Sequence, residues 1–232
     1  MKRFFKIAIV VFAAHIIGSC SKIDPDDILG SVEMEGMFDV TSYTEWHYFA
    51  IVNGALVEVM TYEDDEVITE NVPSTDMYGD DIISTQYDRS TPDEVKNNAD
   101  WLFAVCRYEV RTNSGESSNN NGGLYTFENG ELYDDVDALP SAATFEADYY
   151  GGGTQMTGEI IYKPLSTAKV ADFAVDSDGN TIMPPSYVKS ALYAVRSGDG
   201  NTVYALDFAS YQNPANGYTG YATIQVKEIT IE

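Results

Sequence analysis

Short runs of alternating apolar and polar residues recur along the chain from residue 40 onward, separated by clusters of glycine, asparagine and aspartate. Alternation with a period of two is typical of strands that bury one face. In the run 101–111 it predicts a single strand with one face carrying Val105, Arg107, Glu109 and Arg111. No long window has a helical period, and only Pro92 with the acidic residues after it predicts a short helical turn. The pattern therefore predicts an all-β fold.

Turn signals predict that the strands pair as antiparallel hairpins. An Asn-Gly pair suits the left-handed dihedrals of a tight hairpin turn. The predicted hairpins join 46–52 to 55–60 through Asn53-Gly54, 124–127 to 131–133 through Asn129-Gly130, and 190–196 to 202–211 through 197–201. In the last strand the apolar positions change parity between Val226 and Ile229, which predicts a bulge near Lys227 and Glu228.

The remaining organisation is that of one domain. The segment 113–123 consists almost entirely of small and polar residues, so we expect it to run over the surface. The chain has 17 tyrosines, 10 phenylalanines and 44% hydrophobic residues, enough for a sizeable core. Because no repeat or second boundary is evident, residues 39–232 are expected to form a single antiparallel β-rich domain.

The N-terminus has the features of a bacterial lipoprotein signal. A basic start and the apolar run 7–17 precede Gly18-Ser19-Cys20, which fits a lipoprotein cleavage box. We therefore expect residues 1–19 to be removed, Cys20 to carry the lipid, and residues 20–38 to include an acidic tether. An ordinary secretory signal with a chance cysteine is the alternative.

Charge and cysteine content narrow the possible partners. Cleavage would take the formal net charge from −24 to −27, because the signal holds three basic residues and no acidic residue. Such a surface repels nucleic acid and anionic headgroups. With Cys20 lipidated, Cys106 has no partner for an intrachain disulfide and is expected to be a small buried hydrophobe.

Signals for catalysis are weak. His47 would be the only histidine after cleavage, and its strand predicts a packed position. Acidic pairs are frequent, but they are typical of solvated loops, and no specific pair supports a glycosidase. The run from Asp176 to Asn180 resembles the start of a calcium loop, yet Val188 stands near the position of its last acidic ligand, which favours a turn. The sequence therefore predicts a binding protein and not an enzyme.

Three blocks of sequence resemble the HmuY-like haemophores, surface lipoproteins that capture haem for Gram-negative bacteria. The blocks are Arg107–Ser117 ending in Gly122-Gly123, Tyr43–Val59, and Val195–Gln212. The resemblance implies an HmuY-type all-β domain on the outer membrane, exposed at the cell surface. It also implies that haem or a related porphyrin is taken from host or community haemoproteins and passed to a TonB-dependent receptor.

The resemblance also points to ligand segments. The founding haemophore holds haem iron with two histidines, which this chain lacks. Methionines stand at or near both ligand positions, so the resemblance implies axial ligation by Met156 and Met183, with Tyr187 beside them. A thioether is a soft, neutral ligand that favours ferrous haem. Nearby tyrosines could stack on the ring or bind propionates: Tyr149, Tyr150 and Tyr162.

Two alternatives remain open from the residues. A methionine is most often core filler, so Met156 and Met183 could be structural. The protein could also bind a protein or glycan partner through exposed tyrosines on the same fold, without haem. A porphyrin-sized cleft between the two methionine segments would favour the haem interpretation.

Overall fold

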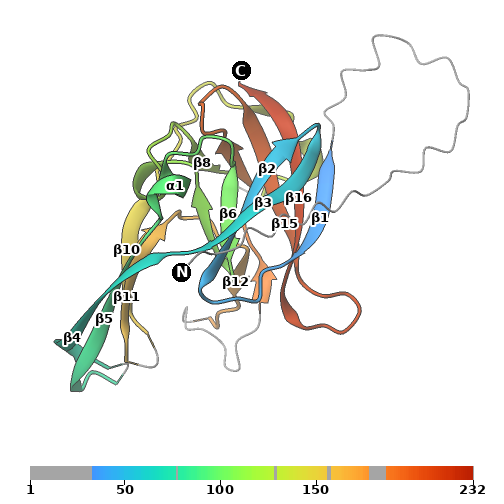
Figure 1. Cartoon of the computed structure of the whole chain (residues 1–232). Coiled ribbons are helices and arrows are strands. Elements are labelled where there is room, and N and C mark those ends of the chain that lie inside the picture. The colour runs from blue at the N-terminus through green and yellow to red at the C-terminus, as the bar shows by residue number, and fades with distance from the viewer. Residues whose placement is uncertain (1–32, 77, 128–129, 156–157, 178–186, 232) are drawn as a thin grey trace, which may run out of the picture.

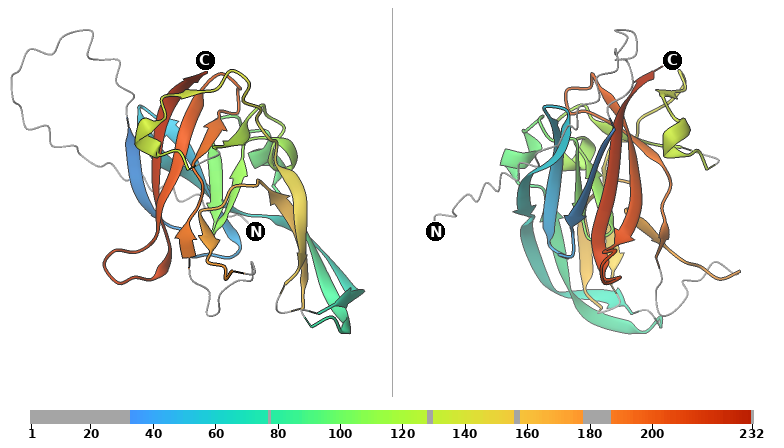
Figure 2. Two further views of the ribbon diagram at one scale, coloured as in Figure 1. Left: turned by 180° about the vertical axis from the view of Figure 1, so that it is seen from behind. Right: turned by 90° about the vertical axis from the view of Figure 1, so that its right-hand side faces the viewer.

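The computed structural model describes residues 33–76, 78–127, 130–155, 158–177 and 187–231, and these form a β-rich domain (Figures 1 and 2). Its helices are short: α1 (Asp93–Lys96) and the 3-10 helices η2 (Gly115–Ser117) and η3 (Tyr133–Asp135). Within the described ranges, no helix is long and apolar enough to cross a membrane. The predicted all-β class and the short helical turn after Pro92 are both confirmed.

Two sheets form the body of the molecule. The first has the strand order β1 (Met34–Asp39), β16 (Thr219–Ile231), β15 (Val203–Gln212), β14 (Tyr193–Arg196) and β8 (Gly123–Thr126), with β9 (Ala138–Leu139) beside β16. The second has the order β3 (Ala55–Glu63), β2 (Glu45–Val52), β6 (Phe103–Cys106) and β7 (Glu109–Thr112). Nearly all of these pairs are antiparallel, the exception being β9 with β16. The first strand begins at Met34, inside the range predicted as tether.

A third sheet projects from the body as an arm, which Figure 1 shows at the lower left. Its strand order is β10 (Tyr149–Thr154), β11 (Ile160–Leu165), β5 (Asp81–Ser90) and β4 (Asp65–Thr75). A separate small hairpin pairs β12 (Ala171–Phe173) with β13 (Tyr187–Lys189). The β10–β11 and β12–β13 hairpins extend toward the same end of the molecule (Figures 1 and 2).

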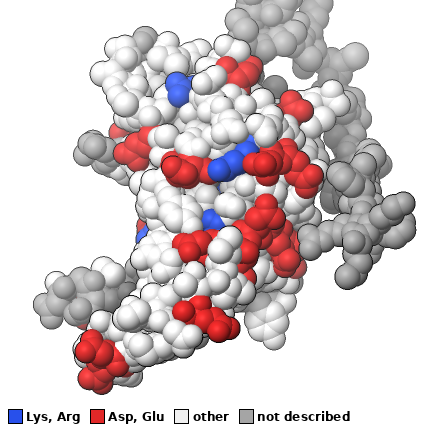
Figure 3. Space-filling model, turned by 60° about the vertical axis from the view of Figure 1, so that its left-hand side comes forward, with Lys and Arg blue, Asp and Glu red and all other residues white. Residues whose placement is uncertain are grey.

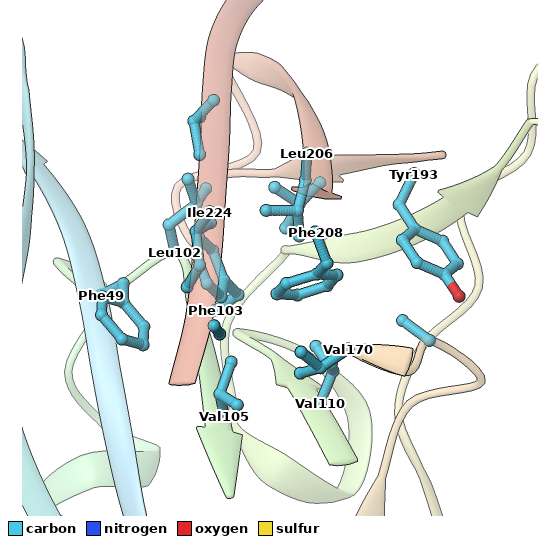
Figure 4. Packing of buried hydrophobic residues seen from close by; sticks show 14 of the residues in the cluster. Phe49, Leu102, Phe103, Val105, Val110, Val170, Tyr193, Leu206, Phe208 and Ile224 are labelled. Atoms are coloured by element: carbon cyan, nitrogen blue, oxygen red, sulfur yellow. The ribbon is translucent and has the colours of Figure 1, made fainter. Parts of the chain in front are cut away.

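The main core lies between the two body sheets (Figure 4). Phe49 and Phe103 of the second sheet stack at 5.1 Å, and Phe103 meets Phe208 of the first sheet edge-to-face at 6.4 Å. Ile224 completes this layer from β16 and is fully buried. Burial of several large apolar side chains, each contributing about 1.5–3 kcal/mol, accounts for most of the stabilisation of this interface.

Smaller clusters cover the outer faces of both sheets. Trp46, Tyr48 and Trp101 pack behind the second sheet, where Cys106 is also buried, as predicted. Tyr133 and Leu139 pack behind the first sheet on Ile229. Both sheets are therefore covered on their outer faces as well as on their inner faces. This explains why both faces of some strands are apolar.

The predicted bulge near Lys227 and Glu228 is wrong. The pairing of β16 with β15 is regular there, and the register shifts lie farther along, beyond Phe208. Val226 faces the main core, whereas Ile229 faces the cluster around Tyr133. The buried apolar side chains of β16 therefore switch from one face of the strand to the other without a bulge. The main core covers the face of Val226, and the cluster around Tyr133 covers the face of Ile229.

Two hairpin expectations are confirmed and one is wrong. Asn53 and Gly54 have φ of 52° and 73° between β2 and β3, and β14 pairs with β15. The strand 124–127 does not pair with 131–133: β8 pairs with β14, and Tyr133 begins η3. Residues 128–129 lie outside the described residues.

The run 101–111 also differs from its prediction. It forms two strands, because a two-residue turn at Arg107 and Tyr108 folds β7 back on β6. Val105 pairs with Val110 on the main-core face, while Ala104 pairs with Arg111 on the other face. Residues paired across a two-residue turn lie on the same face of the sheet. Val110 and Arg111 therefore lie on the faces opposite to those predicted for one continuous strand.

Candidate ligand-binding site

The candidate site lies at the end of the molecule toward which the two small hairpins project. The predicted iron ligands Met156 and Met183 and the predicted lipidation site Cys20 lie outside the described residues. Met156 belongs to the connection that follows β10, and Met183 to the connection between β12 and β13. The predicted contact residue Tyr187 is described and is the first residue of β13. The structure therefore describes the strands next to both predicted ligand segments.

The β10–β11 hairpin is built around glycines that permit close backbone approach. Gly152 has φ of 148°, and a Cβ at this position would lie 1.9 Å from the carbonyl oxygen of Ile161. At the neighbouring Gly153, with φ of 157°, a Cβ would meet no atom within 4 Å. Gly152 is therefore required for β10 to pair with β11, whereas Gly153 faces open space.

Tyrosines of the same hairpin form an exposed aromatic pair. The rings of Tyr150 and Tyr162 stack at 6.2 Å with an interplanar angle of 21°. The Tyr150 hydroxyl donates to Asp88 at 3.2 Å, so this hydroxyl already has a partner. Tyr149 lies on the opposite face of the strand and is about half exposed. These rings are available for stacking, but they do not share one face.

Tyr187 lies at the centre of an aromatic cluster at the base of the β12–β13 hairpin. It faces Phe173 across the hairpin at 5.2 Å and Tyr211 of β15 at 4.9 Å. Tyr108, in the β6–β7 turn, packs edge-to-face on Phe173 at 5.4 Å. The hairpin is thus attached to the body through aromatic contacts on two sides.

A pocket of about 170 Å³ lies beside this cluster, between β13 and β15. Tyr187, Lys189 and Tyr211 are among the residues that line it. The volume is below the roughly 300–1,000 Å³ of typical small-molecule pockets. The described residues therefore form a small pocket and do not by themselves form a porphyrin-sized cleft.

An ion pair also attaches the β12–β13 hairpin to the body. Lys189 Nζ lies 2.9 Å from Asp207 of β15, whose side chain is 3% exposed. The other carboxylate oxygen of Asp207, Oδ1, is buried and has no hydrogen-bond partner within the described residues. A buried carboxylate with one partner makes removal of Lys189 costly.

Arg107 is a basic residue in contact with this cluster, and no local pattern in the sequence predicts its environment. It occupies the first position of the β6–β7 turn with φ of 59°, a left-handed conformation that costs a residue other than glycine about 1–3 kcal/mol. Its Cζ lies 4.8 Å from the ring centre of Tyr43 and 5.8 Å from that of Tyr211. Glu109, two residues farther along the chain, pairs with Lys163, and Arg111 pairs with Asp64.

The electrostatics of the cluster follow from burial. Desolvation raises the pKa of Tyr211 far above its usual value, and the positive charge of Arg107 opposes this shift. Burial also raises the pKa of Tyr108, with a further contribution from the charge of Glu109. The phenols are therefore neutral at physiological pH. Among the charged side chains in the view of Figure 3, acidic ones predominate over lysines and arginines.

The segment 113–123, predicted to lie on the surface, is largely buried. Asn113, Ser114, Ser117 and Ser118 are at most 2% exposed. Asp148, at the foot of β10, accepts hydrogen bonds from the Thr112 amide at 2.8 Å and the Thr112 hydroxyl at 2.6 Å, and Ser117 donates a third. Small polar side chains can be buried here because they satisfy one another and the backbone.

His47 lies in β2, 12% exposed, with Nδ1 3.2 Å from Glu58, so it occupies the packed position that its strand predicted. Among the described residues, no group of three or more histidine, cysteine, aspartate or glutamate side chains could hold a metal ion. The described part of the site consists of aromatic rings with the guanidinium of Arg107 beside them.

Comparison with known proteins gives two solved structures of the same fold. An apo HmuY analog from Tannerella forsythia is 17% identical with a TM-score of 0.54, covering 86% of this chain and 97% of its own. Apo PinO, from Porphyromonas gingivitis as its description has it, is 16% identical with a TM-score of 0.52, covering 85% and 96%. A Bacteroides vulgatus protein described as HmuY-like and heme-binding is 21% identical, with a TM-score of 0.46 and coverage of 88% and 93%.

Comparison with curated proteins gives no significant match. The family model described as HmuY protein, however, matches residues 42–226, which include the second body sheet, the arm, the aromatic cluster and most of the first body sheet. The chain belongs to the HmuY family.

Proposed function

We propose that this protein is a surface lipoprotein that binds haem or a related porphyrin at the two-hairpin end and passes it to a TonB-dependent receptor of the outer membrane. Membership of the HmuY family supports binding as the class of activity. Cys20 would carry the lipid that holds the protein at the outer membrane. Host or community haemoproteins would be the source of the ligand.

The observation that carries the proposal is the aromatic cluster of Tyr187, Phe173 and Tyr211 at the base of one ligand segment. A porphyrin is flat, apolar on both faces and anionic at one edge. Aromatic rings and a basic residue that makes no ion pair with any described residue fit such a group, whereas an acidic surface does not. Burial of the macrocycle against these rings would provide much of the affinity.

The iron would be held by the thioethers of Met156 and Met183. Haem, when bound, would supply an iron whose two axial positions accept soft neutral ligands. Thioethers do not titrate as imidazoles do, so binding would vary little with pH. The β10–β11 and β12–β13 hairpins would bring the two methionines to opposite faces of the ring.

An optical titration with haemin tests this proposal. We expect saturable one-to-one binding by the chain with Cys20→Ser, and a loss of affinity of about tenfold or more in Met156→Ala and in Met183→Ala. Met37→Ala is a matched control, because Met37 lies in β1 and is 51% exposed. Unchanged binding in both site variants would exclude methionine ligation. Absence of any binding would exclude the haem function.

A second function, the binding of a protein or glycan without haem, is favoured by the apolar side chains that the arm exposes. Val67, Ile68 and Ile83 are 56–68% exposed on β4 and β5, and Tyr78 beyond β4 is 82% exposed. Exposed apolar groups gathered on one projection are typical of interaction surfaces. A featureless haemin titration together with retention of the protein on a glycan array or by a partner would support this second function.

A further inference from the structure

Arg107 has no acidic partner among the described residues, although the chain has 37 acidic and 13 basic residues. Among the described arginines, Arg89 and Arg111 pair with carboxylates, at 2.8 Å and 2.6 Å. Arg107 makes no ion pair with any described residue. Its Nη1 and Nη2 donate only long hydrogen bonds, to the Thr41 carbonyl at 3.4 Å and the Thr219 hydroxyl at 3.3 Å. Three of the five guanidinium hydrogens therefore have no acceptor among the described residues.

The surroundings of Arg107 place its guanidinium in a fixed position without neutralising it. Gly220 lies against Nη1, and a Cβ on this glycine would approach Nη1 to 2.5 Å. The rings of Tyr43 and Tyr211 lie beside the guanidinium plane. The Nε atom is buried without an acceptor in the described part of the chain. A buried donor that lacks an acceptor is costly, and a ligand acceptor would remove that cost.

A phenol beside Arg107 is also without a partner. The Tyr211 hydroxyl is buried and makes no hydrogen bond to any described residue. Tyr211 lines the pocket next to Tyr187, and its electrostatic neighbours include Arg107 and Tyr43. Tyr43, 66% exposed, is the more exposed of the two rings beside the guanidinium. One cation and one neutral hydroxyl thus form a donor set suited to a carboxylate.

We propose that Arg107, with the Tyr211 hydroxyl, binds a carboxylate of the ligand, and that in a porphyrin this carboxylate is a propionate. This inference rests on the proposed porphyrin-binding function. It means that the propionate edge of the porphyrin would face the body of the protein. The left-handed backbone at Arg107 is then a conformational cost retained for a side chain that the ligand needs.

Arg196 provides the matched comparison within the chain. Its guanidinium also lies on a ring, 4.7 Å from the centre of Phe145, and donates to the Gly122 carbonyl at 3.0 Å. Its Nε is likewise buried without a partner in the described structure. However, Arg196 is at the end of β14, and its ring neighbour carries no hydroxyl. An isolated guanidinium on a ring is therefore not sufficient, and we assign no ligand to Arg196.

The test compares iron-free protoporphyrin with its dimethyl ester, so that iron ligation does not contribute. Porphyrin fluorescence gives the affinity of the Cys20→Ser chain and of Arg107→Gln, Arg107→Lys and Arg196→Gln in the same background. We expect the diacid to bind about tenfold or more tightly than the ester. Arg107→Gln should lower diacid affinity to that of the ester and leave ester affinity unchanged. The diacid affinity of Arg107→Lys should lie between those of the parent and Arg107→Gln. The diacid affinity of Arg196→Gln should equal that of the parent.

Equal affinity of the parent chain for diacid and ester would overturn the inference, and this arm requires no variant to fold. Unchanged diacid binding in Arg107→Gln, with the circular dichroism of the parent, would also overturn it. In both cases porphyrin binding itself would stand. Failure of the parent chain to bind haemin, the diacid and the ester would instead overturn the proposed function, and this inference with it.

Discussion

The guanidinium of Arg111 donates hydrogen bonds to both carboxylate oxygens of Asp64, at 2.6 and 2.7 Å, with the two side chains 0% and 3% exposed. Arg111 Nε also donates to the Pro164 carbonyl at 2.7 Å, and Cζ lies 3.7 Å from the ring centre of Trp46. Asp64 precedes β4 and Pro164 is in β11, so this one side chain joins two strands of the arm to the body.

Removing the acid from this pair is expected to be strongly destabilising. Asp64→Ala leaves the Arg111 charge buried and unpaired, which costs about 3–5 kcal/mol of the free energy of unfolding. Urea denaturation measures the change. Glu66→Ala is the control, because Glu66 and Arg89 form a more exposed pair, 30% and 17% exposed, which contributes about 0–1 kcal/mol. Equal losses in the two variants would contradict the role given to Asp64.

Asp148 is expected to make stability depend on pH. Burial raises its pKa from 3.8 to about 6, and the hydrogen bonds from Ser117 and Thr112 oppose this shift only in part. The folded state therefore binds a proton more tightly than the unfolded state, and this contribution to stability decreases as pH rises from about 4 to about 6. Asp148→Asn does not titrate, so its stability relative to the parent should improve across this interval, by up to roughly 3 kcal/mol.

Urea midpoints at several pH values between these limits measure the effect of Asp148. The other carboxylates contribute equally to the parent and to Asp148→Asn, so the difference between the two isolates this group. A difference in the free energy of unfolding that stays constant with pH would show that Asp148 titrates alike in the folded and unfolded states.

Gly152 and Gly153 provide a matched pair for the β10–β11 hairpin. Gly152→Ala places a methyl group against the Ile161 carbonyl, whereas Gly153→Ala places it in open space, and both carry a similar left-handed strain. We expect Gly152→Ala to reduce the free energy of unfolding by at least about 2 kcal/mol more than Gly153→Ala does. Hydrogen exchange should locate the loss of protection in β10 and β11. Similar behaviour of the two variants would mean that β10 is not held closely against β11.

Cys106 is expected to be unreactive in the folded protein. Its side chain is 1% exposed, and desolvation raises the pKa of the thiol to about 12. Because the thiolate is the reactive species, reaction with a disulfide reagent at pH 8 should be negligible until denaturant is added. In the Cys20→Ser chain Cys106 is the one remaining thiol, so the reaction reports on Cys106 alone. Rapid reaction without denaturant would show that the cluster behind the second sheet opens readily.

Local signals in the sequence predicted strands and turns well where the structure depends on the conformation of a few neighbouring residues. Asn53-Gly54 gave the hairpin and Pro92 the helical turn, because both depend on backbone dihedrals of a few residues. The two-residue turn at Arg107 was missed, because an arginine with φ of 59° is not a turn signal. The missed turn reversed the predicted facing of Arg111, the residue that joins arm and body.

Long-range burial is the part that local patterns could not predict. The polar segment around Ser117 is buried because Asp148, distant in the sequence, accepts its hydrogen bonds. Ile229 departs from the parity of Val226 because a second layer, around Tyr133, covers that end of β16. For the site, Tyr187 stays a prediction from the family resemblance. The environment of Arg107 is formed by residues distant in the sequence, such as Tyr211 and Thr219, and became evident only in the structure.

The most direct test of the account is the optical spectrum of the haem complex after reduction with dithionite. If Met156 and Met183 ligate the iron, the Cys20→Ser chain should give sharp low-spin ferrous bands at one haem per protein, with little change between pH 6 and 9. Double replacement of these methionines by alanine should abolish those bands, and Met37→Ala should leave them intact. A featureless or high-spin spectrum of the parent in the reduced state would contradict methionine ligation at the two-hairpin end.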